Sequence, residues 1–273
     1  MGVSRALALL QQRESIKMSD FLAKIKDFCI KKQDFLILLL ISCTMLGYAI
    51  YLEHCDPLLS RDSVLYVQAM DLWNQSGNPE SILNEDPNWK APLFPLFLMK
   101  LLVPLGFSIE QSALCINLAA AFFLPLLMFG IAEMLTKNRK IAYIAAVLTA
   151  FHPTILSMAI QAQRDTLYLF FLAGFLYLFF AALMRQKYLY WGAAGALFAL
   201  GVLTRYEMAE FLPIPLAILL WEMYRKKITF QYLLRSCLIF FGSMILAGIF
   251  AMYLSDTLSV TENIYWTRIH LFI

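Results

Sequence analysis

Four charged residues from distant parts of the chain have types that suit chemistry on an anionic substrate: Asp62, Lys90, Asp165 and Arg205. A carboxylate can take up a proton from an attacking hydroxyl. A cation beside a helix N-terminus attracts phosphate and can offset the charge that develops on it. Each residue also has an ordinary explanation, a helix-dipole match for the aspartates and a membrane-interface position for the cations. The elements that carry these residues therefore decide whether they share a site.

The composition requires these elements to be membrane helices. Apolar residues make up 61% of the 273 residues and charged residues only 15%, too few to cover a water-soluble domain. The net charge of +3 is small and comes from residues that flank apolar runs, which excludes nucleic acid as a partner. The first apolar run, 35–51, follows a basic stretch and lacks a small-x-small cleavage site, so it predicts a signal anchor.

Apolar segments long enough to cross about 30 Å of hydrocarbon predict seven transmembrane helices. They are expected at residues 35–51, 109–135, 140–158, 165–184, 189–204, 208–223 and 236–254. This topology places 16 of the 22 Lys and Arg residues on the cytoplasmic side with the N-terminus, as the positive-inside rule requires. The apolar stretch 92–104 carries three prolines and is too short to span, so it predicts a juxtamembrane helix.

The chain is expected to have three parts. Residues 1–33 predict a cytoplasmic basic amphipathic segment, because apolar residues recur at helical spacing among lysines. Residues 34–254 predict an all-α transmembrane module, with juxtamembrane helices in a long first outer loop at 53–108. Residues 255–273 predict an outer C-terminal tail. A loop as long as the first outer loop usually serves a function.

One helix is expected within this outer loop, over residues 61–75, capped by Ser60 and ended by Gly77. The residues expected on its apolar, membrane-facing side are Leu65, Ala69, Leu72 and Trp73. Asp62 and Tyr66 are four residues apart and therefore face the same way.

All four charged residues fall on the outer side in this topology. Lys90 precedes the short proline-rich helix, Asp165 stands at the start of a helix, and Arg205 stands at an outer helix boundary. Their coincidence predicts an active site at the membrane surface. His152, in the outer turn Phe151-His152-Pro153, is a further candidate that could bind a metal ion together with a carboxylate.

The order of four stretches resembles that of the GT-C membrane glycosyltransferases, which include protein O-mannosyltransferases and bacterial lipid A aminoarabinose transferases. The stretches are RDSVLYVQA, KAPLFPLFL, HPTILSMAIQAQRDTLYLFF and ALGVLTRYEMAEFLP. The resemblance implies a multi-pass enzyme of the bacterial inner membrane that serves the cell envelope. Such an enzyme moves a sugar from a polyprenyl-phosphate donor to a hydroxyl of a lipid, glycan or protein acceptor, with inversion.

The resemblance also implies roles for single residues. Asp62 would act as the base or orient the acceptor, and Tyr66 beside it would contact substrate. Lys90 and Arg205 would offset the negative charge left on the lipid phosphate. Asp165 would supply a second acidic position or hold a divalent metal ion.

Two features depart from the resemblance. Arg61 precedes Asp62 where many relatives carry an acidic pair, and the chain stops at Ile273 where relatives continue with more helices and an outer soluble domain. Two alternatives stay open, a transporter or flippase for a lipid-linked sugar and a non-catalytic membrane scaffold. A transporter needs polar groups near the bilayer centre, where the predicted spans offer mainly Asn117.

Overall fold

The computed structural model describes residues 33–54, 61–78, 81–82 and 94–254. Every regular element in this part of the chain is a helix, which confirms the all-α prediction. The chain divides into two units after Ile41, and the helix Gln33–His54 runs across that boundary. The remaining helices all belong to the second unit.

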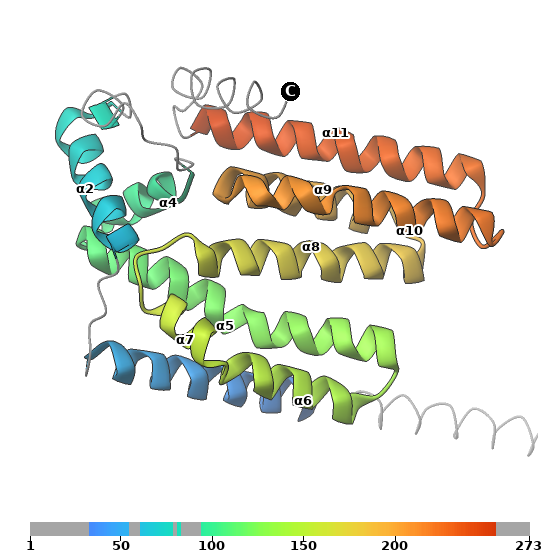
Figure 1. Cartoon of the computed structure of the whole chain (residues 1–273), viewed down its shortest axis with the longest axis horizontal. Coiled ribbons are helices and arrows are strands. Elements are labelled where there is room, and N and C mark those ends of the chain that lie inside the picture. The colour runs from blue at the N-terminus through green and yellow to red at the C-terminus, as the bar shows by residue number, and fades with distance from the viewer. Residues whose placement is uncertain (1–32, 55–60, 79–80, 83–93, 255–273) are drawn as a thin grey trace, which may run out of the picture. The chain divides into compact units, whose positions relative to one another are not determined.

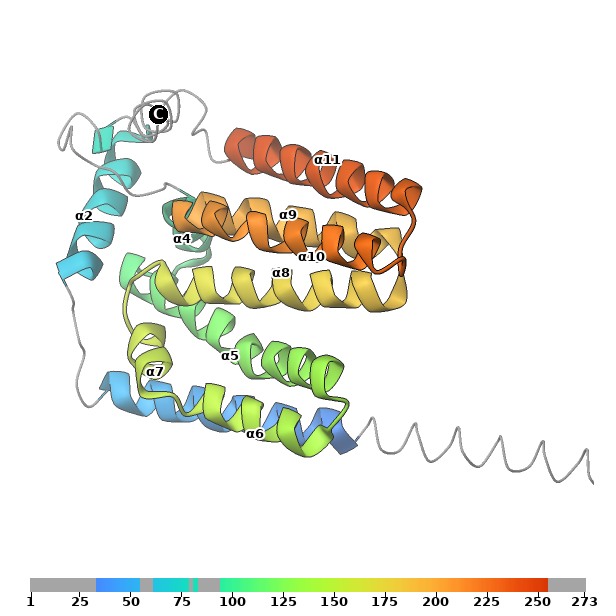
Figure 2. The ribbon, with the colours of Figure 1, turned by 45° about the vertical axis from the view of Figure 1, so that its right-hand side comes forward.

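Five helices of the second unit form a row in which each packs against its neighbours (Figure 1). In order across the row they are α6 (Arg139–Ala150), α5 (Ile109–Thr136), α8 (Asp165–Arg185), α9 (Tyr188–Thr204) and α11 (Phe230–Leu254). A turned view keeps the same order and brings α10 (Pro213–Tyr224) in front of α9 (Figure 2). The apolar sequence of these helices suits a bundle whose outer surface faces lipid.

Aromatic rings and one glycine fix the contact between α8, α9 and α11. Phe175 of α8 meets Phe198 of α9 edge to face, with ring centroids 5.1 Å apart, and lies 6.1 Å from Phe240 of α11. Gly195 lets α11 approach closely, because a Cβ there would lie 2.2 Å from the Phe240 carbonyl oxygen. Such close approach through a small residue is typical of helix pairs in membranes.

The predicted count of seven spans is not confirmed. Four described helices are long and apolar enough to cross a membrane: Gln33–His54, α5, α8 and α11. A fifth is formed by α6 and α7 (Pro153–Ala159), if that pair, bent by 51°, is counted as one span. At 17 residues α9 falls just short of the length for a span, and α10 has only 12.

Prolines explain why two predicted spans differ from continuous helices. The segment expected at 140–158 breaks at His152, which takes an extended conformation (φ −69°, ψ 121°) before Pro153, as residues before proline prefer. The segment expected at 208–223 starts instead as the 3₁₀ helix η2 (Tyr206–Phe211), and α10 follows from Pro213. Proline favours the first turn of a helix because its missing N–H has no partner there.

Two shorter helices, α2 (Arg61–Ser76) and α4 (Phe94–Leu102), lie near the start of α5 (Figure 1). The range of α2 agrees with the prediction, and it ends as expected at Gly77, whose φ is 70°. Ala69 and Trp73, which were expected on a membrane-facing side, are instead buried inside the protein, whereas Leu65 is 41% exposed. Tyr66 is buried with them, since it lies three and seven residues from these two residues. Ser60 lies outside the described residues.

At the opposite end of the row, short turns join α5 to α6, α8 to α9 and α10 to α11. Each turn has one residue with positive φ: Lys137 (55°), Gln186 (50°) and Lys226 (56°). A left-handed residue within two positions of a helix end stops the helix and turns the chain.

Candidate active site

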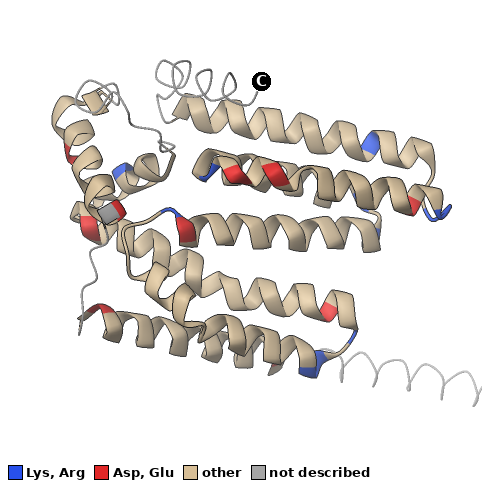
Figure 3. Ribbon diagram, viewed as in Figure 1, with Lys and Arg blue, Asp and Glu red and all other residues tan. Residues whose placement is uncertain are grey.

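Charged side chains separate between the two ends of the helix row (Figure 3). Lys and Arg gather in the three short turns, and Asp and Glu are concentrated where α8 begins and α9 ends. We call the second region the acidic end and define it by the residues Asp62, Tyr66, Arg164, Asp165, Tyr168, Arg205 and Glu207.

The centre of the acidic end is an ion pair between Asp165 and Arg205, 40 residues apart in the sequence. Asp165 begins α8 and Arg205 follows α9, so the packing of these two helices brings the side chains together. The Arg205 guanidinium also lies 3.3 Å from a Glu207 carboxylate oxygen and 5.5 Å from the centre of the Tyr168 ring. Two carboxylates and an aromatic face therefore hold this cation in place.

Tyr66 of α2 joins this group from another part of the chain. Its side chain is 5% exposed and packs in one cluster with Ala162, in the turn before α8, and with Tyr206 of η2. Burial raises the pKa of Tyr66 far above its ordinary value; the nearby Arg164 guanidinium opposes this increase, and the carboxylates of Asp165 and Asp62 add to it. The Tyr66 hydroxyl is therefore neutral at physiological pH.

Asp62 lies one turn before Tyr66 on the same side of α2, and its side chain is exposed. The structure thus brings four of the predicted site residues to one end of the bundle: Asp62, Tyr66, Asp165 and Arg205. An exposed carboxylate beside a half-buried ion pair is accessible to a substrate hydroxyl.

Sequence reasoning missed Arg164 and Glu207 as members of this group. The guanidinium of Arg164 lies near both Tyr66 and Glu207. Burial acts to raise the pKa of Glu207, but its own backbone N–H and the charges of Arg205 and Arg164 outweigh burial and lower it. The signal was available, because Arg164 directly precedes Asp165 and Glu207 follows Arg205 by two residues.

Asn117 positions the turn that carries Arg164 and Asp165. It lies on α5, is 2% exposed, and its side-chain amide donates a hydrogen bond of 2.9 Å to the Gln163 carbonyl and another to the Gln161 carbonyl. A buried amide in a membrane helix needs such partners. The main interior polar residue of the predicted spans therefore supports the acidic end from within the bundle.

Lys90 lies outside the described residues, so the structure says nothing of its position. His152 is exposed at the bend between α6 and α7. In the described ranges no three His, Cys, Asp or Glu side chains gather to hold a metal ion. Asp165 already pairs with Arg205. These residues therefore do not offer a fitting ligand set, and a divalent ion stays a prediction.

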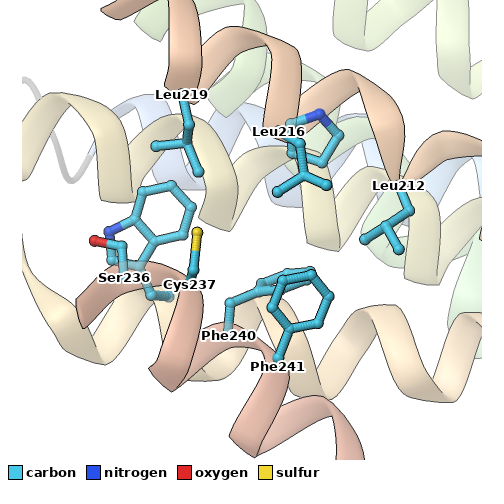
Figure 4. A pocket seen from close by; sticks show the side chains of 9 residues that line it. Leu212, Leu216, Leu219, Ser236, Cys237, Phe240 and Phe241 are labelled. Carbon is cyan, nitrogen blue, oxygen red and sulfur yellow. The ribbon is translucent and has the colours of Figure 1, made fainter. Parts of the chain in front are cut away.

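A separate, small apolar cavity lies between α9, α10 and α11 (Figure 4). Its lining residues are Trp191, Leu212, Pro215, Leu216, Leu219, Ser236, Cys237, Phe240 and Phe241. The lining carries no charged side chain, so this cavity cannot supply the acid, base or phosphate-binding groups of a transfer reaction.

Membrane-length helices with a mixed cluster of charges at one end define a multi-pass membrane protein with a candidate site at the end of its bundle. The profile of the dolichyl-phosphate-mannose-protein mannosyltransferase family matches residues 90–253, more than half of the chain. The chain belongs to this family, which confirms the predicted resemblance, and it is a membrane glycosyltransferase for which the family implies a polyprenyl-phosphate sugar donor. The matched range includes Lys90, Asp165 and Arg205 but not Asp62 or Tyr66. No curated protein and no solved structure matches the chain.

Proposed function

We propose that this protein transfers a sugar from a polyprenyl-phosphate donor to an acceptor hydroxyl of a lipid, glycan or protein at the outer face of the bacterial inner membrane. The observation that carries the proposal is the meeting of Asp62, Tyr66, Asp165 and Arg205 at one end of the bundle. Family membership supports the donor class. The acceptor and the membrane face belong to the proposal.

The reaction is a displacement at the anomeric carbon with inversion. The acceptor oxygen forms a bond to that carbon while Asp62 takes up the hydroxyl proton. The bond to the phosphate oxygen breaks, and the lipid phosphate leaves with the electron pair. Arg164 and Lys90 offset the charge on this phosphate, because Asp165 and Glu207 already balance Arg205.

Arg205 and Tyr66 then mainly position other groups of the site and the substrate. Arg205 keeps the start of α8 beside the end of α9, so that Arg164 stays close to Tyr66. The neutral Tyr66 hydroxyl can donate a hydrogen bond to a substrate oxygen. Charges that are held in place before substrate arrives need little reorganisation in the transition state.

The same proposal includes seven membrane crossings, an N-terminus in the cytoplasm and a C-terminus outside. In support, α9 packs lengthwise between α8 and α11, although it is shorter than an ordinary span (Figures 1 and 2). The three turns rich in Lys and Arg lie at the end opposite Asp165. The positive-inside rule places such turns in the cytoplasm and the acidic end outside.

The test compares Asp62→Asn with Asp71→Asn in membranes given labelled polyprenyl-phosphate sugars. Asp71 is an exposed residue on the same helix, and nine positions at about 100° each place it on the opposite side from Asp62. Loss of a general base should slow transfer by roughly a hundredfold or more in Asp62→Asn. Asp71→Asn should transfer sugar at the wild-type rate.

Equal transfer by wild type and Asp62→Asn at equal protein level would contradict the proposed role of Asp62. The same assay separates the alternatives. A flippase would move the label across the membrane while it stays on the polyprenyl phosphate, and a scaffold would leave it where it was added. Covalent label on an acceptor is expected only from a transferase.

A further inference from the structure

The end of the bundle opposite the acidic end carries an excess of positive charge. We call it the basic end, and its cations are Lys137, Arg139, Lys140, Arg185, Lys187, Arg225, Lys226, Lys227 and Arg235. Two acids are paired there, Glu133 with Arg139 at 3.2 Å and Glu222 with Lys227 at 3.1 Å. The other seven cations are exposed and have no carboxylate partner among the described ion pairs.

A hydrogen-bonded tyrosine holds two of the three turns together. Tyr232, near the start of α11, accepts a hydrogen bond of 2.9 Å from Trp191 Nε1 and donates one of 3.3 Å to the Ala182 carbonyl in the last turn of α8. Its ring also lies 5.5 Å from that of Tyr188, at the start of α9. The α8–α9 turn and the α10–α11 turn are therefore parts of one surface.

This surface gathers five of the seven uncompensated cations, and we call it the two-turn patch. Its cations are Arg185, Lys187, Arg225, Lys226 and Arg235. Exposed aromatic side chains flank it, among them Tyr224 (78% exposed), Trp221 (57%) and Tyr188 (36%). Trp and Tyr favour the headgroup level of a bilayer, so the patch should lie where lipid phosphates lie.

The α5–α6 turn differs although it is also basic. Lys137 and Lys140 are exposed there, but the large exposed side chains beside them are the aliphatic residues Leu135 and Ile141. Lys137 Nζ lies 3.7 Å from Met184 Sδ, in the last turn of α8. The α5–α6 turn nevertheless offers two uncompensated cations against five in the two-turn patch, and it lacks the aromatic flank.

We propose that the two-turn patch binds the headgroup of an anionic phospholipid, with the Lys and Arg side chains around its phosphate and the flanking Tyr and Trp side chains at the glycerol and upper acyl level. Guanidinium and ammonium groups form charge-assisted hydrogen bonds with phosphate oxygens. Clusters of cations beside membrane helices attract anionic lipids for this reason. The binding does not depend on sugar transfer. The opposing explanation is that these cations only match the negative ends of helix dipoles.

The experiment compares two double variants with the same loss of charge. Lys187→Gln with Lys226→Gln removes two cations from the patch, and Lys137→Gln with Lys140→Gln removes two from the α5–α6 turn. Each variant changes one residue with positive φ, and Gln186 shows that glutamine accepts this conformation. Purified proteins are reconstituted with phosphatidylcholine plus phosphatidylglycerol or cardiolipin, and retained lipid is counted by native mass spectrometry.

The patch variant should lose retention of the anionic lipid about tenfold, and the control variant less than about twofold. Equal loss in both variants, or none in either, would overturn the proposal. If the patch variant does not fold, thermal unfolding of the wild-type protein with added lipid still tests the proposal. A short-chain phosphatidylglycerol should raise its melting temperature with saturation, and no rise beyond that given by phosphatidylcholine would also overturn the proposal.

Discussion

The two ends of the helix bundle carry similar residue types in opposite arrangements. At the acidic end, Arg205 is held by Asp165 and Glu207, and Asn117 fixes the turn behind Asp165. At the basic end, most cations lack a carboxylate partner within the described chain. Charges that are fixed before substrate arrives suit a reaction site, and uncompensated exposed charges suit a mobile anionic partner. Charge pairing therefore separates the two ends better than the number of charges does.

The largest expected effect comes from unpairing the acidic end. Asp165→Asn leaves Arg205 with only Glu207 and loosens the start of α8, so sugar transfer should fall about a hundredfold. Glu222→Gln is the control, because it breaks an ion pair with Lys227 at the basic end. It should leave transfer unchanged. Equal transfer by Asp165→Asn and wild type would remove the functional difference between the two ends.

A change in the bundle interior should affect both ends together. Gly195→Ala would place a Cβ 2.2 Å from the Phe240 carbonyl oxygen, so α9 and α11 must move apart, at a cost of about 1–3 kcal/mol. Gly192→Ala is the matched control, since its Cβ would meet Ile239 Cγ2 at an ordinary 3.6 Å. Thermal unfolding should show a lower melting temperature for Gly195→Ala only, with both transfer and lipid retention reduced. Equal melting temperatures would mean that the α9–α11 contact is looser than described.

The smallest expected effect concerns one hydroxyl. Burial raises the pKa of folded Tyr66 above its ordinary value of 10.0, so the folded state keeps this proton when the unfolded state has lost it. The Tyr66 contribution to stability is therefore present below about pH 10 and is lost as the pH rises beyond it. Tyr66→Phe should remove this part of the alkaline loss, measured as the difference between wild-type and variant unfolding curves from pH 8 to pH 11. Parallel curves would place Tyr66 in contact with water.

Much of the fold follows from the sequence, because apolar length and breaker residues determine local helices. The ranges of α2, α5, α8 and α9 were predicted to within one or two residues, and Gly77 ends α2 as expected. The bend at His152 shows the limit. Pro153 is a helix-breaking residue, but hydropathy alone predicted residues 140–158 as one continuous span.

The sequence predicted at which end of the bundle the site residues lie, but not which of them are in contact. Topology placed Asp165 and Arg205 on one side, but their ion pair depends on how α8 packs against α9. The partners of Asn117 lie more than 40 residues away in the sequence, and no periodicity within one helix could reveal them. Long-range pairing of polar groups needs the fold itself.

The tight turn between α8 and α9 determines which side of α9 faces α8 and α11. Only Gln186 and Lys187 separate Arg185 from Tyr188, and Gln186 already has a left-handed conformation. The turn therefore cannot take up an extra residue without moving a helix. One inserted residue would have to be absorbed by turning α9 about 100° around its axis. That rotation would carry Gly195 away from α11 and Arg205 away from Asp165 at the same time. Length changes in this connection should therefore be poorly tolerated, and a series of one-residue insertions assayed for sugar transfer would measure the loss.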